Sequence, residues 1–239
     1  MKSPILIIPM LLIMLACSVR SAAQQFDLND IYFDYWDNGD IFYFQWVTTG
    51  DTIKVDTLKT GAILYEIDGF FIGRTEVTNK LWNSMLDIPA KDAETELLPK
   101  TGVTVAEIDT FCARLYQATS MEWRLPSREE WLHAYHGGVF SEGYTYSGSD
   151  HVSWSGWTAC NSKGKLHPVG ELVPNEVHLQ DMTGNAAELA TDGEDLVVMG
   201  GCYLDNNPTA EQKNTATPSS AIGFRVVSRH VMSFMDTGL

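Results

Sequence analysis

The sequence predicts a single α+β domain in which short antiparallel strands and about three helices support much irregular chain. Three observations predict it. Strand-like segments fill residues 24–73, amphipathic helical segments fill residues 78–137, and glycines, tryptophans and polar turns dominate from residue 139 onward. With 239 residues, 44% of them hydrophobic, the chain is long enough to bury one sizeable core, and nothing forces a second domain.

Residues 1–23 are expected to be an export signal. Lys2 precedes an apolar stretch that is too short for a mature transmembrane helix, and the small residues Ser21-Ala22-Ala23 end the segment. We favour simple cleavage after Ala23. Because Met14-Leu15-Ala16-Cys17 resembles a bacterial lipobox, a lipid anchor at Cys17 stays open. Either route exports the protein to the periplasm, the outer surface or the exterior.

The charge balance argues against nucleic acid as a partner. The chain has 16 basic and 31 acidic residues, for a formal net charge of −15. The export signal contains Lys2 and Arg20 and no acidic residue, so the mature chain is more acidic still. A polyanion would be repelled by such a surface. The excess of carboxylates is explained most simply as keeping a secreted protein soluble.

Three cysteines remain after cleavage at Ala23, namely Cys112, Cys160 and Cys202. An odd number in an oxidising compartment allows at most one internal disulfide. Cys112 falls on the apolar face of a predicted helix, with Ile108 and Leu115 at helical spacing, and is expected in the core.

The strand segments begin with an aromatic hairpin. In "IYFDYWDNGDIFYFQWV" two aromatic runs flank Asp37-Asn38-Gly39-Asp40, and Asn-Gly supplies the positive φ angles of a tight turn. We assign residues 24–46 to an N-terminal hairpin extension and residues 47–239 to the main domain. "DTIKVDTL" and "GAILYEIDGFFIG" predict two further strands, and "LVVMGG" and "GFRVVS" predict short strands near the C-terminus.

Capping residues mark the starts of the three predicted helices. Thr78 is a plausible N-cap for the first, and Thr104-Val105-Ala106-Glu107 and Ser127-Arg128-Glu129-Glu130 are capping boxes for the second and third. The third helix is expected to stop at Gly137-Gly138, because glycine adopts the left-handed backbone of a helix end at little energetic cost.

Five stretches together resemble the formylglycine-generating enzyme (sulfatase-modifying factor) family. They are, in order, "GFFIGRTEVTNKLWNSML", "WRLPSREEWLHAYHGG", "HPVGELVPNEVHLQDMTGNAAELATDG", "VMGGCY" and "IGFRVV". The resemblance implies a compact fold related to the C-type lectin fold. It also implies structural roles for Arg124, Trp131 and Arg225, the two guanidiniums tying loop carbonyls together.

The resemblance implies a copper-dependent oxidation of a sulfatase cysteine, performed by two thiols that follow a Gly-Gly-Ser-Tyr stretch. Here Cys202 stands where that serine should be, Asp205 stands where the first thiol should be, and no later cysteine exists. Copper(I) requires soft ligands, for which a carboxylate is a poor substitute. Copper is therefore not expected, and Cys202 is expected to be packed or paired with Cys160.

Related domains bind calcium near the stretch "LQDMTGNAAELATDG". The resemblance therefore makes Asp181, Asn185, Glu188 and Asp192 candidate calcium ligands, since all four offer hard oxygen atoms. The stretch lacks the spacing of an EF-hand loop. A turn capped by Asn185 and a solvated Glu188 is the alternative interpretation.

The sequence contains no Ser-His-Asp arrangement, phosphate loop or Cys-x-x-Cys motif. We therefore expect a non-catalytic binding or structural module of the cell envelope, with an unidentified protein or glycan as ligand. The expected binding surface is the loop over residues 203–220, led by Tyr203, Asp205, Asn206 and Asn207. The alternative is a divergent formylglycine-generating oxidase that uses Cys202 together with Cys160.

Overall fold

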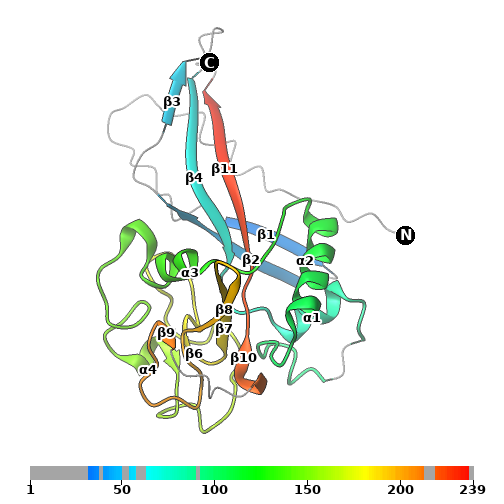
Figure 1. Cartoon of the computed structure of the whole chain (residues 1–239), viewed down its shortest axis with the longest axis vertical. Coiled ribbons are helices and arrows are strands. Elements are labelled where there is room, and N and C mark those ends of the chain that lie inside the picture. The colour runs from blue at the N-terminus through cyan, green and yellow to red at the C-terminus, as the bar shows by residue number, and fades with distance from the viewer. Residues whose placement is uncertain are drawn as a thin grey trace.

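The structure is a computed structural model and describes residues 32–37, 40–49, 54–57, 63–89, 92–212 and 219–236 (Figure 1). It confirms the predicted α+β class. The expected export signal and Cys17 lie outside the described residues. Within the described ranges no helix has the length and apolar character needed to cross a membrane.

The three predicted helices form where the capping residues indicated. They are α1 (Asn79–Met85), α2 (Val105–Thr119) and α3 (Arg128–Tyr135), with N-caps at Thr78, Thr104 and Ser127. Both capping boxes are complete, with reciprocal side-chain and backbone hydrogen bonds. Gly137 follows α3 with φ of 84°. A fourth, short helix, α4 (Val152–Ser155), was not predicted.

The main sheet is antiparallel and built from distant parts of the chain. Its strands are β1 (Tyr32–Asp37), β2 (Asp40–Thr48), β4 (Ile63–Gly73) and β11 (Val227–Asp236), in the order β1-β2-β4-β11, with β3 (Lys54–Thr57) also pairing with β4. The predicted hairpin forms, with Asp37 opposite Asp40. Because β2 also pairs with β4, the expected extension (24–46) and the main domain share one sheet.

The strands β3, β4 and β11 form a ribbon that projects from the body of the molecule (Figure 1). In this ribbon β4 and β11 pair from Ile72 opposite Val227 to Ile63 opposite Asp236. The sequence predicted only a short strand in "GFRVVS". The strand in fact begins at Val227 and runs to Asp236, because β4 supplies a pairing partner along its whole length.

A second sheet lies in the loop-rich half, in the order β10-β7-β8-β9. Its strands are β10 (Ile222–Gly223), β7 (Ala187–Asp192), β8 (Asp195–Met199) and β9 (Glu211–Gln212). A separate pair joins β5 (Gly156–Trp157) to β6 (Thr183–Gly184). The prediction of β8 is confirmed, whereas β7 was not predicted.

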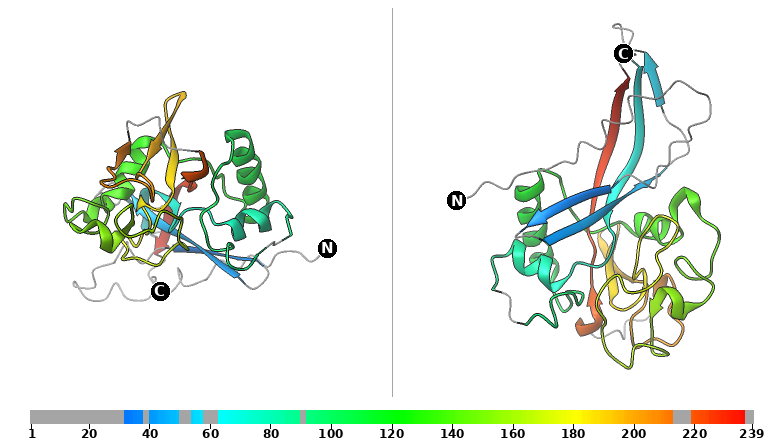
Figure 2. Two further views of the ribbon diagram at one scale, coloured as in Figure 1. Left: turned by 90° about the horizontal axis from the view of Figure 1, so that it is seen from below. Right: turned by 180° about the vertical axis from the view of Figure 1, so that it is seen from behind.

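Two apolar clusters form the core. The first packs α1 and α2 against the main sheet and includes Phe44, Trp82, Phe111 and Phe224. Cys112 belongs to this cluster, as predicted. The second joins α3 to β4 and the loop-rich half through Trp131, Tyr135, Phe70, Ile72, Leu179 and Val227. Seen from behind, β1 and β2 cross in front of the junction between the two halves (Figure 2).

Candidate functional site

A sharp turn follows β8 and carries the cysteine that the family pattern singles out. Gly200 and Gly201 have φ angles of 79° and 69°, a left-handed backbone that favours glycine. A Cβ atom on Gly200 would lie 2.8 Å from the carbonyl oxygen of Met182, and one on Gly201 would lie 2.5 Å from Cβ of Pro208. Both glycines are therefore required by conformation and by close approach.

Cys202 packs as a small apolar side chain inside this turn. It is 2% exposed and clusters with Ala187 and Ala221. Its backbone N–H donates to Oδ2 of Asp205 at 2.7 Å, and its carbonyl accepts from the N–H of Asp205 at 3.0 Å. Asp205, the residue in the first thiol position, thus closes the turn around Cys202.

The surroundings of Cys202 keep its thiol protonated. Burial, assisted by the charge of Asp205, raises the pKa of Cys202 to about 11. A thiolate is the form that attacks or binds metal, so this side chain is unreactive at neutral pH. One protonated thiol and a carboxylate committed to a backbone N–H do not fit the soft ligand set that copper(I) requires.

Cys160 does not pair with Cys202 in the structure. Both are free thiols, and Cys160 is exposed while Cys202 is buried. The two loops are nevertheless neighbours. The Sγ atom of Cys160 lies 3.9 Å from the carbonyl oxygen of Asn206, and the N–H of Ala159 donates to the carbonyl of Asp205 at 3.0 Å.

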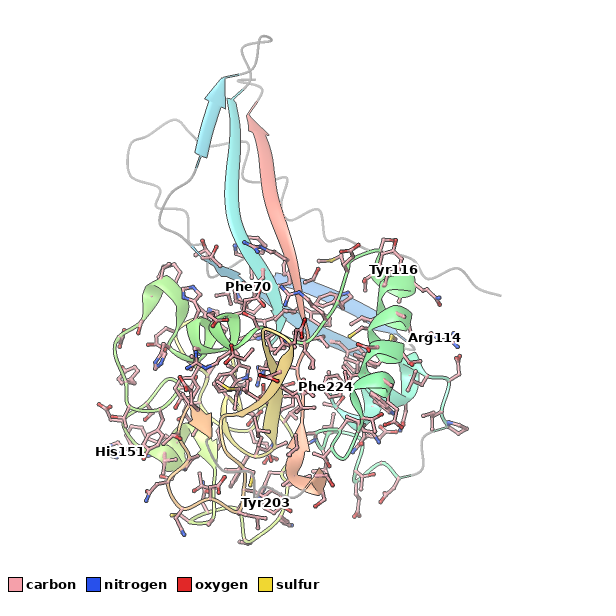
Figure 3. The ribbon with its side chains drawn as sticks, viewed as in Figure 1. Phe70, Arg114, Tyr116, His151, Tyr203 and Phe224 are labelled. Carbon is pink, nitrogen blue, oxygen red and sulfur yellow. The ribbon has the colours of Figure 1, made fainter. Side chains whose placement is uncertain are left out.

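The predicted binding loop is partly described. Tyr203 is half-buried, and Asn206 and Asn207 are exposed. Figure 3 shows Tyr203 at the end of the body farthest from the projecting ribbon. The hydroxyl of Ser162 donates to the carbonyl of Tyr203 at 2.8 Å, which anchors the loop. Residues 213–218 of the predicted surface lie outside the described residues.

A buried ion pair joins Glu188 on β7 to Arg225, which follows β10. Arg225 is fully buried and donates from Nε and Nη2 to the two carboxylate oxygens of Glu188, each at 2.6 Å. Its remaining donors reach the carbonyl oxygens of Gly73 at 2.9 Å and Gln180 at 3.0 Å. The indole N–H of Trp131 donates to Glu188 at 2.7 Å. The guanidinium of Arg225 thereby connects three segments. They are the end of β4, the loop that precedes β6, and strand β7.

Two further carboxyl groups are buried beside this pair. Oε1 of Glu76 accepts from the N–H of Ala186 at 3.3 Å, and Oδ2 of Asp181 accepts from the N–H of Gly170 at 2.7 Å. The other oxygen of each has no hydrogen-bond partner among the described residues. Burial raises the pKa of Glu76 well above its usual range and that of Asp181 to about 6. Both groups take up protons more readily than exposed acids.

The four candidate calcium ligands have different surroundings. Asp181 and Glu188 lie in the buried cluster, Asp192 is exposed at the end of β7, and the side chain of Asn185 bonds to the backbone N–H and carbonyl of His167. Across the described ranges, no group of three or more His, Cys, Asp or Glu side chains could hold a metal ion. In this arrangement the four do not form a coordination shell, and calcium binding stays a prediction.

Arg124, expected to be structural, lies nearer the surface than Arg225. Its Nη1 and Nη2 atoms form a bidentate pair with Glu130, each at 2.7 Å. Its backbone N–H and carbonyl bond to Val227 at 3.0 and 2.8 Å. Arg124 therefore fixes the start of α3 against the base of β11.

Sequence reasoning did not identify Glu76. A single acid in "RTEVTN", just after a strand, is typical of a solvated turn. Its burial depends on the distant Ala186 and Arg225, so no local signal could have revealed it. The role of Asp205 as the acceptor that closes the turn was also missed, because the sequence marked it as a substituted thiol position and as part of the expected binding surface.

The fold and this site define a sulfatase-modifying factor domain. Residues 48–230 match the family described as "Sulfatase-modifying factor enzyme 1-like domain", and the chain belongs to that family. A relative from Paenibacillus barcinonensis, named "Chaperone protein LppX", is 27% identical, and the match spans 59% of this chain and 73% of the relative.

Solved structures share the fold at low sequence identity. Treponema denticola variable protein 1 matches with a TM-score of 0.65 and 19% identity, over 84% of this chain and 99% of that protein. CarF matches with a TM-score of 0.59 and 18% identity, over 78% and 97%. PvdO from Pseudomonas aeruginosa matches with a TM-score of 0.51 and 17% identity, over 75% and 98%.

The raised pKa of Asp181 predicts a pH dependence of stability. The carboxyl group ordinarily titrates at 3.8 but holds its proton up to about pH 6 in the fold. The stabilisation is fully present below pH 3.8 and is lost as pH rises through about 6. Wild type should lose roughly 2 to 3 kcal/mol between pH 4 and pH 7 relative to Asp181→Asn, which keeps an acceptor for Gly170.

Urea unfolding at several pH values measures this difference directly. Asp192→Asn, at an exposed position on the same stretch, is the matched control and should retain the wild-type profile. Parallel profiles for wild type and Asp181→Asn would contradict the prediction.

Proposed function

We propose that this chain is an exported binding module of the cell envelope that retains the fold of its family without the family's oxidation chemistry. The observation that carries the proposal is the state of Cys202. Its thiol is buried and protonated, and the carboxylate of Asp205, at the position of the family's first thiol, bonds to the backbone N–H of Cys202. Such a group has neither the charge nor the exposure that a nucleophile or metal ligand needs.

The loop that closes over Cys202 offers a recognition surface. Asn206 and Asn207 present exposed amides, and Tyr203 adds a half-buried aromatic ring. Hydrogen bonds from Ser162 and Ala159 hold this part of the loop, so these groups are ordered before a ligand arrives. Amides and tyrosine are suited to polar ligands, and we favour a protein or glycan partner. A binding role is also compatible with the relative named a chaperone.

One observation keeps the oxidase alternative in view. The loop of Cys160 lies against the loop of Cys202, since the Cys160 thiol approaches the carbonyl of Asn206. A rearrangement that turned Cys202 outward would bring two thiols to neighbouring loops. Such a movement would also break the hydrogen bond between Cys202 and Asp205 and expose the small apolar cluster beneath it.

We expect no formylglycine formation by this protein. The reduced mature chain would be loaded with copper(I), mixed with a peptide carrying Cys-x-Pro-x-Arg under air, and followed by mass spectrometry. A family member that has both thiols provides the positive control. Conversion of the peptide cysteine by the wild type, lost in Cys202→Ser, would establish the oxidase alternative and overturn the proposal.

Replacing Asn206 and Asn207 with alanine should leave the free energy of unfolding within about 0.5 kcal/mol of wild type, as expected for exposed side chains away from caps and networks. Asp205→Ala is the matched contrast. It should cost about 1 to 3 kcal/mol, because the buried N–H of Cys202 loses its acceptor. Denaturant unfolding distinguishes the two cases. A large loss of unfolding free energy in the asparagine double variant would show that these side chains stabilise the fold, and would count against a recognition role.

A further inference from the structure

A cleft of about 340 Å³ opens at the junction between the helices and the loop-rich half. It lies beside β2, which crosses this junction in the right-hand view of Figure 2. The end of β4, the start of α1 and the loop around residues 169–180 complete the walls. The apolar side chains that line it include Phe42, Tyr43, Leu81, Leu97, Val169 and Val226.

Arg74 brings to this cleft a positive charge that has no acidic partner among the described residues. Its Nε donates to the carbonyl of His178 at 3.3 Å, and its guanidinium lies 5.5 Å from the centroid of the Tyr43 ring. The two terminal amino groups make no hydrogen bond or ion pair with any residue that the structure describes. The chain has 31 acidic and 16 basic residues, so an arginine that meets no carboxylate among the described ones is available to bind an anion.

The backbone of Arg74 is held on both sides. Its N–H donates to the carbonyl of Tyr43 at 3.1 Å, and its carbonyl accepts from the N–H of Gln180 at 2.8 Å. The second contact also ties Arg74 to the loop anchored by Arg225. The base of the side chain is therefore fixed before a ligand binds, which lowers the entropy lost on binding.

The charges nearby reinforce Arg74. Lys80 also lines the cleft and carries a second positive charge, with its Nζ 3.8 Å from a carboxylate oxygen of Glu96. Glu76 is an acidic residue that also lines the cleft. Burial raises the pKa of Glu76 well above its usual range, which favours the neutral form of this carboxyl group.

We propose that this cleft binds a small amphipathic anion, with a carboxylate or phosphate on Arg74 and an aromatic or alkyl body against the apolar wall. The planar guanidinium can donate two parallel hydrogen bonds to either headgroup. The volume of the cleft falls at the lower end of the range for small-molecule sites. This site is separate from the Tyr203 loop and does not depend on the function proposed for that loop.

Isothermal titration calorimetry on the whole mature chain tests the proposal with three probes that share a phenyl body. 3-Phenylpropionate carries a carboxylate, phenyl phosphate carries a phosphate, and 3-phenylpropanol is neutral. We expect saturable one-site binding of at least one anion, about tenfold or more tighter than the alcohol. The two anionic arms show which headgroup the site prefers.

Matched variants locate the binding. Arg74→Gln should weaken the anion about tenfold or more, whereas Arg114→Gln, at an exposed position on α2, should change affinity less than about twofold. Val169→Trp keeps both charges and should abolish binding by filling the cleft. Circular dichroism and melting curves establish that each variant is folded.

The proposal is overturned if neither anion binds saturably, or if the alcohol binds as tightly as the anions. It is equally overturned if Arg74→Gln and Arg114→Gln have the same effect, or if Val169→Trp leaves the affinity unchanged.

Discussion

The ion pair between Arg225 and Glu188 is the interaction on which the loop-rich half of this protein depends. Regular strands there are short, so many backbone carbonyls lack a partner from secondary structure. Arg225 supplies donors to Gly73 and Gln180, while Glu188 accepts from Arg225 and Trp131. A buried pair repays its desolvation only when its hydrogen bonds are satisfied in this way, and removing one partner leaves an uncompensated charge.

The carboxyl groups around Arg225 outnumber the one positive charge that they face. One guanidinium faces Glu188, Glu76 and Asp181, and the raised pKa values of Glu76 and Asp181 favour their neutral forms. Glu188 already pairs with a cation of the protein itself. Two of the candidate calcium ligands connect loops in this arrangement, since Asp181 accepts from the N–H of Gly170 and Asn185 accepts from the N–H of His167.

Local signals in the sequence predicted the helices and the hairpin, because these elements are specified by neighbouring residues. Thr104 and Glu107 cap α2 reciprocally, and the turn after Asp37 pairs the two aromatic strands. The family motifs correctly predicted the fold. Strand β7 escaped prediction because its buried Glu188 is unlike a strand residue until Arg225 is placed beside it, and Glu76 escaped because its burial also depends on residues far along the chain.

The ion pair between Arg225 and Glu188 also links the cleft at Arg74 to the loop at Tyr203, the two surfaces for which binding is proposed. Arg225 bonds to the carbonyls of Gly73 and Gln180 at one side of the cleft, and Glu188 lies on β7, next to the small cluster under Cys202. A double-mutant cycle with Glu188→Gln and Arg225→Met in denaturant unfolding tests this account most directly. It predicts that each single variant lowers the free energy of unfolding by about 3 to 5 kcal/mol. The loss in the double variant should be well below the sum of the two single losses. A double variant that folds when a single one does not would show the same coupling. Additive losses, or single losses below about 1 kcal/mol, would contradict the account.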